Sequence, residues 1–354
     1  MRRGSSAAPL HAPRRLRGRR RVLALLLCLA HMPADPAAGA ASRTPVLALD
    51  PALNAILSTG ARLHTLIRRD TIFDGPVWVR RGRSGYLLFS DVPGNAIDRL
   101  GPHGRVATFL SDILPARRMP AAYESLGLEG QKRFSMPGPD GMTLDPRGRV
   151  VYCSYSAGEI VRLEGDGRRT VLADRFAGRR LNAPNDLVYA SDGALFFTDS
   201  RAATRRSHGE GVPHEGLYVL RAGKLALLSD RIDHPNGVAL SPRGRHLYVT
   251  DTRRGRVLRF DLRGDGIANE RVFIDMSGNR EPGAPDGIKV DRRGNVYATG
   301  PGGVWIVSAA GRHIGTIRTP RKITNLAFGG PDSRSLYMTA FGALYSIRLI
   351  SPGQ

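Results

Sequence analysis

The stretch "PNDLVYASDGALFFTD" (Pro184 to Asp199) returns 51 residues later as "PNGVALSPRGRHLYVTD" (Pro235 to Asp251). Both copies contain Pro-Asn, an apolar run, a turn with glycine, a second apolar run and Thr-Asp. Two apolar runs joined by a glycine-containing turn are typical of a β-hairpin. Repetition of such a unit every 40–50 residues or so favours a propeller or a solenoid.

Further copies of this unit occur along the chain. They begin at Asp74 ("DGPVWV"), Pro139 ("PDGMTLDPRGRVVYCS"), Pro285 ("PDGIKVDRRGNVYATG") and Thr324 ("TNLAFGGPDSRSLYMTA"). From Asp140 onward the key positions are 45, 51, 50 and 39 residues apart, whereas the first gap is 66. The surplus falls within residues 114–136, which we expect to form a loop or a short helix over one face.

Each copy predicts an inner strand and a second strand, and further strands follow in several repeats. Third strands are expected at 159–163, 216–220 and 256–261, and outer strands at 169–174 and 271–276. Four antiparallel strands per repeat form one propeller blade, so the sequence predicts an all-β, six-bladed β-propeller. The sixth copy has no outer strand after it. We expect the strand at Ala61–Asp70 to pair with that blade and close the ring.

The N-terminal residues 1–41 are predicted to be a signal peptide or a basic targeting segment. Arginines precede an apolar run of nine residues, Val22 to Ala30, and small residues follow. The run is too short to span a membrane, and "RRRVL" fits a twin-arginine signal. We therefore expect an exported, periplasmic or secreted protein with no stable membrane insertion after signal removal. An uncleaved anchor is the alternative.

Residues 42–60 are expected to be a linker, and residues 61–350 to be the propeller. Cys28 falls in the signal segment, which leaves Cys153 without a disulfide partner in the mature chain. The formal charge is +22, of which the first 41 residues, with eight Arg and one Asp, contribute +7. The remaining arginines lie mostly in turns and do not cluster with aromatic residues, so no nucleic-acid partner is expected.

One residue opens each inner strand and should point towards the axis of the ring. These six positions, called the hub residues below, are Asp74, Asp140, Asn185, Asn236, Asp286 and Asn325. Carboxylate and amide oxygens suit a hard cation such as Ca²⁺; Zn²⁺, Mn²⁺ and Mg²⁺ are alternatives. Asp and Asn are also common turn formers, so a purely structural repeat remains open.

Other polar residues fall near the same end of the strands. Asp91, Asp199 and Asp251 end second strands, and we expect them to cap strand ends or to hydrogen-bond nearby groups rather than to act in catalysis. His208 and His214 lie in a polar stretch between strands and are expected to be surface residues. Substrate-binding candidates are Asp140, Tyr155 and Arg201, together with Asn185.

The sequence resembles the regucalcin and gluconolactonase-like family (senescence marker protein/gluconolactonase/LRE-like), a group of calcium-dependent six-bladed propellers. The likeness covers about residues 62–349 and rests on motifs in a fixed order. These are "FDGPVWV", "RLNAPNDLVYASDGALFFTD", "HPNGVALSPRGRHLYVTD", "APDGIKVDRRGNVYATGPGGVWI" and "NLAFGG".

The resemblance implies that the metal ligands are Asp74, Asn185, Asn236 and Asp286. It also implies that Asp286 is the catalytic base, and that Asn185 contacts either the metal or the substrate. Three departures from the family pattern stand out. Asp74 replaces a glutamate, "CSYSAGE" lacks an acidic residue and histidine after Cys153, and Ala183 replaces an arginine.

The implied activity is calcium-dependent hydrolysis of a sugar lactone by a monomer that acts on a small molecule. No Gly-x-Ser-x-Gly elbow indicates a serine nucleophile. One alternative is a related metal-dependent lactonase, arylesterase or phosphotriesterase. Another is a non-enzymatic propeller that binds a ligand or a protein on its face.

Overall fold

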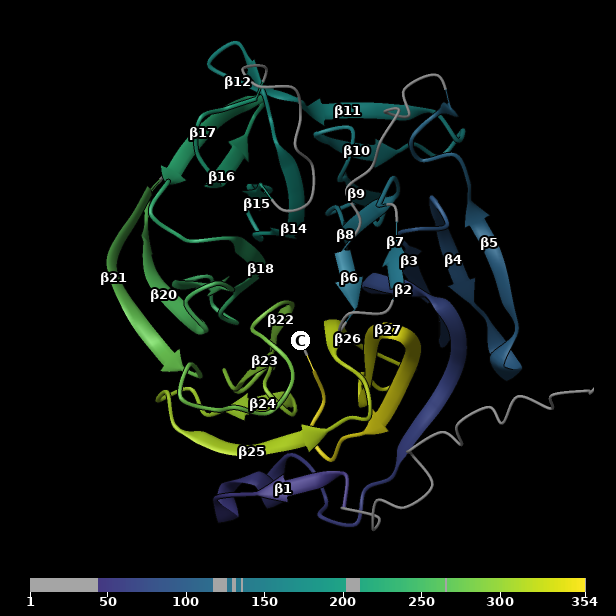
Figure 1. The fold of residues 1–354 in the computed structure, drawn as a ribbon, viewed down its shortest axis with the longest axis vertical. Helices are drawn as coiled ribbons and strands as arrows, with labels where there is room; N and C mark the ends of the chain where they lie inside the picture. The colour runs from purple at the N-terminus through teal and green to yellow at the C-terminus, as the bar shows by residue number, and fades with distance from the viewer. Residues whose placement is uncertain are drawn as a thin grey trace, which may run out of the picture. The chain divides into compact units, whose positions relative to one another are not determined.

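The computed structural model describes residues 44–116, 126–128, 132–134, 136–201, 211–264 and 266–353. The predicted signal peptide and His208 lie outside these residues. The sheets of the described chain are arranged around a common centre (Figure 1). Short strands dominate because apolar, β-branched and aromatic runs alternate with glycine turns throughout.

Three sheets each contain four antiparallel strands in chain order and form blades 2, 3 and 4. Blade 2 comprises β8 (Pro139–Leu144), β9 (Val150–Ser154), β10 (Glu159–Leu163) and β11 (Arg169–Ala173). Blade 3 comprises β14 (Ala183–Tyr189), β15 (Leu195–Ser200), β16 (Gly216–Arg221) and β17 (Lys224–Ser229). Blade 4 comprises β18 (Pro235–Leu240), β19 (His246–Asp251), β20 (Arg256–Arg263) and β21 (Gly266–Asp275).

Blade 5 comprises β22 (Ile288–Val290), β23 (Val296–Gly300), β24 (Gly303–Val307) and β25 (His313–Arg318). The short strand β1 (Val46–Ala48) pairs with β25 at its outer edge. The remaining short elements are outside the blades. They are η2 (Pro51–Ala55), η3 (Pro102–Gly104), β6 (Leu126–Leu128), β7 (Lys132–Phe134), β12 (Arg175–Phe176) and β13 (Arg179–Arg180). Much of the surplus segment 114–136, for which a loop or short helix is expected, lies outside the described residues. Its described part contains the antiparallel pair β6–β7.

A six-stranded sheet contains blades 1 and 6, joined through the 19-residue strand β2 (Leu63–Arg81). The second half of β2 pairs with β3 (Ser84–Asp91), which leads to β4 (Ala96–Leu100) and β5 (Val106–Leu110). The first half, from Leu63, pairs with β27 (Ser335–Arg348), which also pairs with β26 (Ile323–Gly329). The predicted closing strand at Ala61–Asp70 is thereby confirmed.

The innermost strands form a closed ring. The second half of β2 contacts β8, and contacts continue through β14, β18, β22 and β26 back to β2. Six hydrophobic clusters fill the spaces between successive blades. In β15, for example, Phe196 packs towards blade 4 and Phe197 towards blade 2, since alternate side chains face opposite sides of a strand. The predicted six-bladed propeller is confirmed.

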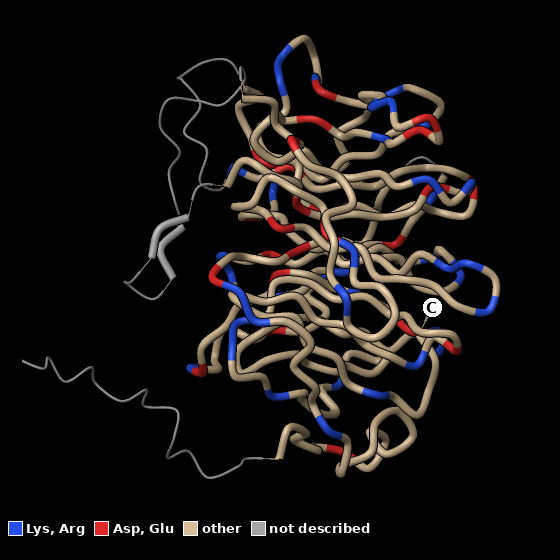
Figure 2. Tube along the Cα trace, turned by 90° about the vertical axis from the view of Figure 1, so that its right-hand side faces the viewer, with Lys and Arg blue, Asp and Glu red and all other residues tan. Residues whose placement is uncertain are grey.

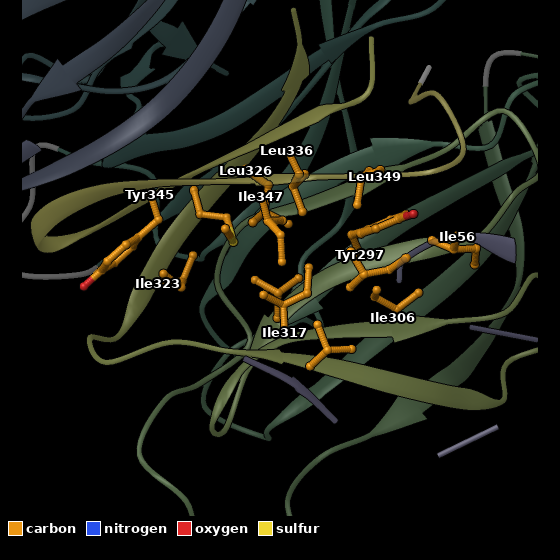
Figure 3. Packing of buried hydrophobic residues seen from close by; sticks show 14 of the residues in the cluster. Ile56, Tyr297, Ile306, Ile317, Ile323, Leu326, Leu336, Tyr345, Ile347 and Leu349 are labelled. Carbon is orange, nitrogen blue, oxygen red and sulfur yellow. The ribbon is translucent and has the colours of Figure 1, made fainter. Parts of the chain in front are cut away.

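Residues 46–57 are part of the propeller rather than of a linker. Leu53 and Leu57 are fully buried, and they lie with Ile56 in the cluster between blades 5 and 6. Figure 3 shows Ile56 beside Tyr297 and Ile306 in this cluster. The sequence predicts a linker for 42–60 because this stretch is short and its apolar residues follow no strand pattern. Burial against two blades decides its structure instead.

Basic side chains are distributed over many loops of the described chain (Figure 2). Many of them form ion pairs, as Arg149 does with Asp145 and Glu164. No helix within the described residues is long and apolar enough to cross a membrane.

Replacing Leu53 by alanine tests the role of the N-terminal segment. A fully buried leucine costs about 2–5 kcal/mol when it is truncated, which lowers the Tm by roughly 5–15 °C. Leu49→Ala is the matched control, because Leu49 is 52% exposed in the same segment. Thermal unfolding followed by circular dichroism measures both variants. Equal Tm values for the two would show that the segment does not stabilise the propeller.

Candidate metal centre and active site

Most of the hub residues lie where an inner strand is irregular. Pairing with the second strand shifts register between Asp74 and Val77, Pro139 and Met142, Pro184 and Leu187, and Pro235 and Val238. A similar shift precedes Asn325. A β-bulge turns a side chain away from its regular direction, and here each bulge contains or adjoins a hub residue. The repeated Pro-Asn/Asp motif therefore specifies a local backbone shape at the channel opening, which we call the mouth.

The glycine after four of the hub residues allows neighbouring blades to approach. A Cβ atom on Gly75 would lie 2.1 Å from the carbonyl oxygen of Asp140, and one on Gly237 would lie 2.3 Å from that of Asp286. Gly141 and Gly287 are equally close to Asn185 and Asn325. Only a residue without a side chain fits these contacts. The glycines are required by packing between blades.

Hydroxyl groups from second strands join each blade to the next. Ser90 Oγ donates to the Asp140 carbonyl at 2.7 Å, and Thr250 Oγ1 donates to the Asp286 carbonyl at 2.7 Å. Thr198 Oγ1 likewise donates to the Asn236 carbonyl at 2.5 Å. These buried bonds fix the backbone that carries the hub residues. The sequence alone did not predict this role, although each hydroxyl residue directly precedes one of the aspartates that end the second strands.

The aspartates at the ends of second strands hold backbone groups, as the sequence predicts. Asp199 accepts hydrogen bonds from the N–H groups of Asn182 and Ala183 at 2.9 and 2.7 Å. Asp251 accepts from the Asp233 N–H group and from Arg256, and Asp91 accepts from Thr71 and Gly94. Asp199 and Asp251 are fully buried and are occupied by these contacts. Their structural role is confirmed.

The hub residues form three carboxyl–amide pairs, each between adjacent blades. Asn185 Nδ2 donates to Asp140 Oδ2 at 3.0 Å, and Asn325 Nδ2 donates to Asp74 Oδ1 at 3.1 Å. The third pair is Asn236 with Asp286. The inner strands thus bring the six predicted hub residues together as three pairs.

The three amide oxygens differ in their partners. Asn325 Oδ1 accepts from the Leu326 N–H group at 2.8 Å and from Lys289 Nζ at 3.2 Å. Among the described residues, the amide oxygens of Asn185 and Asn236 accept no hydrogen bond. Only these two amide oxygens therefore remain available to a ligand.

The pKa values of the three hub carboxyl groups are all raised. Burial raises the pKa of Asp74 to about 6 and that of Asp286 to about 8, and neighbouring carboxylates add to both shifts. Burial, followed by repulsion from Asp74, Asp286 and Asp186, raises the pKa of Asp140 well above its ordinary value. Grouped carboxyls of this kind need either protons or a cation.

Asp186 and Lys289 lie close to the hub residues and were not predicted from the sequence. Asp186 Oδ2 accepts from the Val238 N–H group at 3.2 Å and lies 3.6 Å from Lys289 Nζ. The only sequence signal was "PND", in which Asp186 stands where other repeats have glycine. The lysine partly neutralises this carboxylate.

The other predicted site residues lie around the mouth. Tyr155 is 2% exposed and packs in a cluster with Ile72, Val92, Met136 and Ala183. Arg201 is exposed, and its N–H group donates to Glu215 at 2.8 Å. His214 contacts Tyr218 Oη at 3.0 Å and is partly buried rather than fully at the surface.

Glu215 joins the mouth loops of two blades. Besides the N–H group of Arg201, it accepts the N–H group of His234 at 2.7 Å. Burial alone would raise the pKa of Glu215, but hydrogen bonds from the side chain and backbone of His234 and from Arg201 lower it to about 2. A permanently charged group therefore fixes the segment that leads to Asn236.

The donor set fits a hard cation. The hub provides three carboxyl groups and two amide oxygens that accept no hydrogen bond from a described residue. Contacts between blades hold the backbone that carries them. Within the described part of the chain, no group of three or more His, Cys, Asp or Glu side chains is arranged to hold a metal ion without other ligands. A metal here would thus require the asparagine oxygens, which suit calcium better than zinc.

The fold and the hub define a six-bladed propeller with an oxygen-rich centre. Residues 73–342 match the model of the SMP-30/gluconolactonase/LRE-like region. The chain belongs to this family.

Similar proteins include two gluconolactonases. The enzyme from Zymomonas mobilis is 29% identical over 312 residues, which cover 84% of each chain. The structure of a gluconolactonase from Xanthomonas campestris is 30% identical with a TM-score of 0.73, covering 86% of this chain and 94% of that one. A calcium-binding regucalcin from Agrobacterium tumefaciens shares the fold at 19% identity and a TM-score of 0.64, covering 83% and 96%.

Calcium should stabilise the protein through the hub. At a concentration one hundred times its Kd, calcium is expected to raise the Tm by about 5–10 °C relative to chelator-treated protein. Asp286→Ala should abolish this shift because it removes one ligand and one negative charge. Asp166→Ala is the matched control, since Asp166 is an exposed residue in the turn between β10 and β11. An identical Tm with calcium and with chelator would contradict a calcium site.

Proposed function

We propose that this protein is a calcium-dependent hydrolase that opens a sugar lactone at the mouth of the propeller. The observation that carries this proposal is the hub itself. Three carboxyl groups, of which Asp74 and Asp140 are buried and Asp286 is half-buried, lie there with two available amide oxygens, in a chain that belongs to a family with gluconolactonase members. Two of the similar proteins described above, from Zymomonas mobilis and Xanthomonas campestris, are gluconolactonases.

The proposed calcium ligands are Asp74, Asn185, Asn236 and Asp286. The available oxygens of the two asparagines support this choice, as does the occupied oxygen of Asn325. Asp74 is one methylene shorter than the glutamate expected from the family pattern. Its side chain is held by Asn325 and by the Gly75 N–H group, which orients the shorter carboxylate. Zn²⁺, Mn²⁺ or Mg²⁺ are the alternative ions.

The bound ion would supply Lewis-acid polarisation of the lactone carbonyl. Asp286 is proposed to accept a proton from the attacking water, because it lies at the hub and the family resemblance implies a base at this position. The water oxygen then bonds to the acyl carbon, the ring C–O bond breaks, and the proton returns to the leaving alkoxide. Water and lactone thus give one hydroxy acid.

The remaining mouth residues are proposed to orient the substrate. Asp140 and Asn185 are hydrogen-bonded to each other at the centre, where either can contact a sugar hydroxyl. Tyr155 contributes to an apolar wall, and Arg201 lies on a loop fixed by Glu215. These groups would exclude bulk water on one side of the sugar and bind hydroxyls on the other.

A lactone panel tests the activity. Acid release from D-glucono-1,5-lactone and other lactones is followed by pH drop, with calcium present. Asp286→Ala should lower kcat by at least about 100-fold, since general-base catalysis contributes 10²–10⁴. Asn236→Ala should lower activity and weaken calcium binding together. Asp166→Ala is again the control, and equal turnover by wild type and Asp286→Ala would refute the mechanism.

The same panel separates the competing functions. Turnover of aryl esters or phosphotriesters in preference to sugar lactones would indicate the related hydrolase activity. Calcium binding without turnover of any substrate would favour a non-enzymatic binding propeller.

We also propose that the mature protein is exported as a monomer after cleavage near Ala40. The basic and apolar pattern of residues 1–41 supports export. Cell fractionation and N-terminal sequencing of the mature chain test this proposal, and size-exclusion chromatography with light scattering tests the monomer. Cytoplasmic protein with an intact N-terminus would contradict export.

A further inference from the structure

A cleft of about 360 Å³ opens where blades 6 and 1 meet. Its lining includes Arg68, Arg69, Asp70, Arg321 and Phe341. The arginines come from the middle of β2 and from the segment before β26, 253 residues apart in the sequence. The closing of the ring through β2 brings these segments together (Figure 1).

The cleft carries positive charge that other described residues do not fully neutralise. Arg69 is paired with Asp98 at 2.7 Å, and Asp70 offsets part of the remaining charge. Arg68 and Arg321 are exposed and form no ion pair with any described residue. Both charges act on the phenol of the buried Tyr345. Burial raises the pKa of this phenol, and the charges of Arg68 and Arg321 oppose that shift. Arg68 and Arg321 line the same cleft.

The cleft adjoins the mouth through Phe341 and Lys322. The Phe341 N–H group donates to the Lys322 carbonyl at 3.2 Å, and the Lys322 ammonium lies 5.2 Å from the centre of the Phe341 ring. Lys322 also lies close enough to Asp286 for its charge to oppose the effect of burial on that carboxyl group. Phe341 packs against the apolar cluster that contains Tyr155 and Ile72. Phe341 and Lys322 thus link the cleft to the surroundings of Asp286.

We propose that this cleft is an anion subsite, and that the natural substrate is a lactone carrying a second acidic group, a phosphate or a carboxylate. This inference rests on the proposed lactonase function. Arg68 and Arg321 bind the acidic group while the lactone carbonyl lies at the hub. Arginine suits this role because its planar guanidinium donates two parallel hydrogen bonds to either oxyanion.

The test compares acidic and neutral lactones on calcium-loaded protein. The substrates are D-glucono-1,5-lactone, its 6-phosphate and the carboxylate-bearing glucaro-1,4-lactone. The ratio of kcat/KM for an acidic lactone to kcat/KM for the neutral lactone should exceed one in wild type. It should fall about tenfold in Arg68→Ala or Arg321→Ala, the loss expected for one charge-assisted contact. The acidic lactone whose kcat/KM ratio falls further in these variants identifies the acidic group of the natural substrate.

Direct binding separates failure of the subsite from failure of the enzyme. Calorimetry with the product 6-phosphogluconate should show a Kd that both variants weaken about tenfold. Arg243→Ala is the matched control, an exposed arginine in the β18–β19 turn at the far end of β18 from the hub. Unchanged ratios and unchanged Kd in both cleft variants would overturn the subsite even if lactones are hydrolysed. Arginine-dependent binding without any turnover would support the subsite and refute the lactonase.

Discussion

The close approach of neighbouring inner strands at glycine is the constraint on which the rest of the structure depends. At Gly75, Gly141, Gly237 and Gly287 the next blade leaves no space for a Cβ atom. Hydroxyl groups from Ser90, Thr198 and Thr250 join the same boundaries. Because each contact lies beside a hub residue, the packing that closes the ring also decides where the polar side chains meet.

Bringing the hub carboxyl groups together is electrostatically unfavourable. Burial and mutual repulsion raise the pKa values of Asp74, Asp140 and Asp286, and Lys289 partly compensates for Asp186 behind them. Amide groups hold each carboxyl group in place without neutralising it. A divalent cation would relieve the repulsion where the carboxyl groups are closest, and the same charge would polarise a bound carbonyl. Stability and catalysis would then depend on one ion.

The sequence predicted features that repeat and missed those that do not. The number of blades, the closing strand and the hub residues follow from a motif that occurs six times in the sequence. The structural role of Asp199 and Asp251 was also predicted correctly. Leu53 was missed because its burial depends on blades formed 240 or more residues later in the chain. Lys289 and the pair Arg68 and Arg321 were missed because only the folded ring brings them to their partners. No local pattern distinguishes these residues from surface charges.

The most direct test of the central claim is the position of a bound cation. Crystals grown with calcium, and a second set with Mn²⁺, would be measured for anomalous scattering. We expect one strong peak at the mouth, with oxygen ligands from Asp74, Asn185, Asn236 and Asp286 at the 2.3–2.6 Å or so typical of calcium. A hub without a peak at saturating calcium, or a cation bound only elsewhere, would contradict the account.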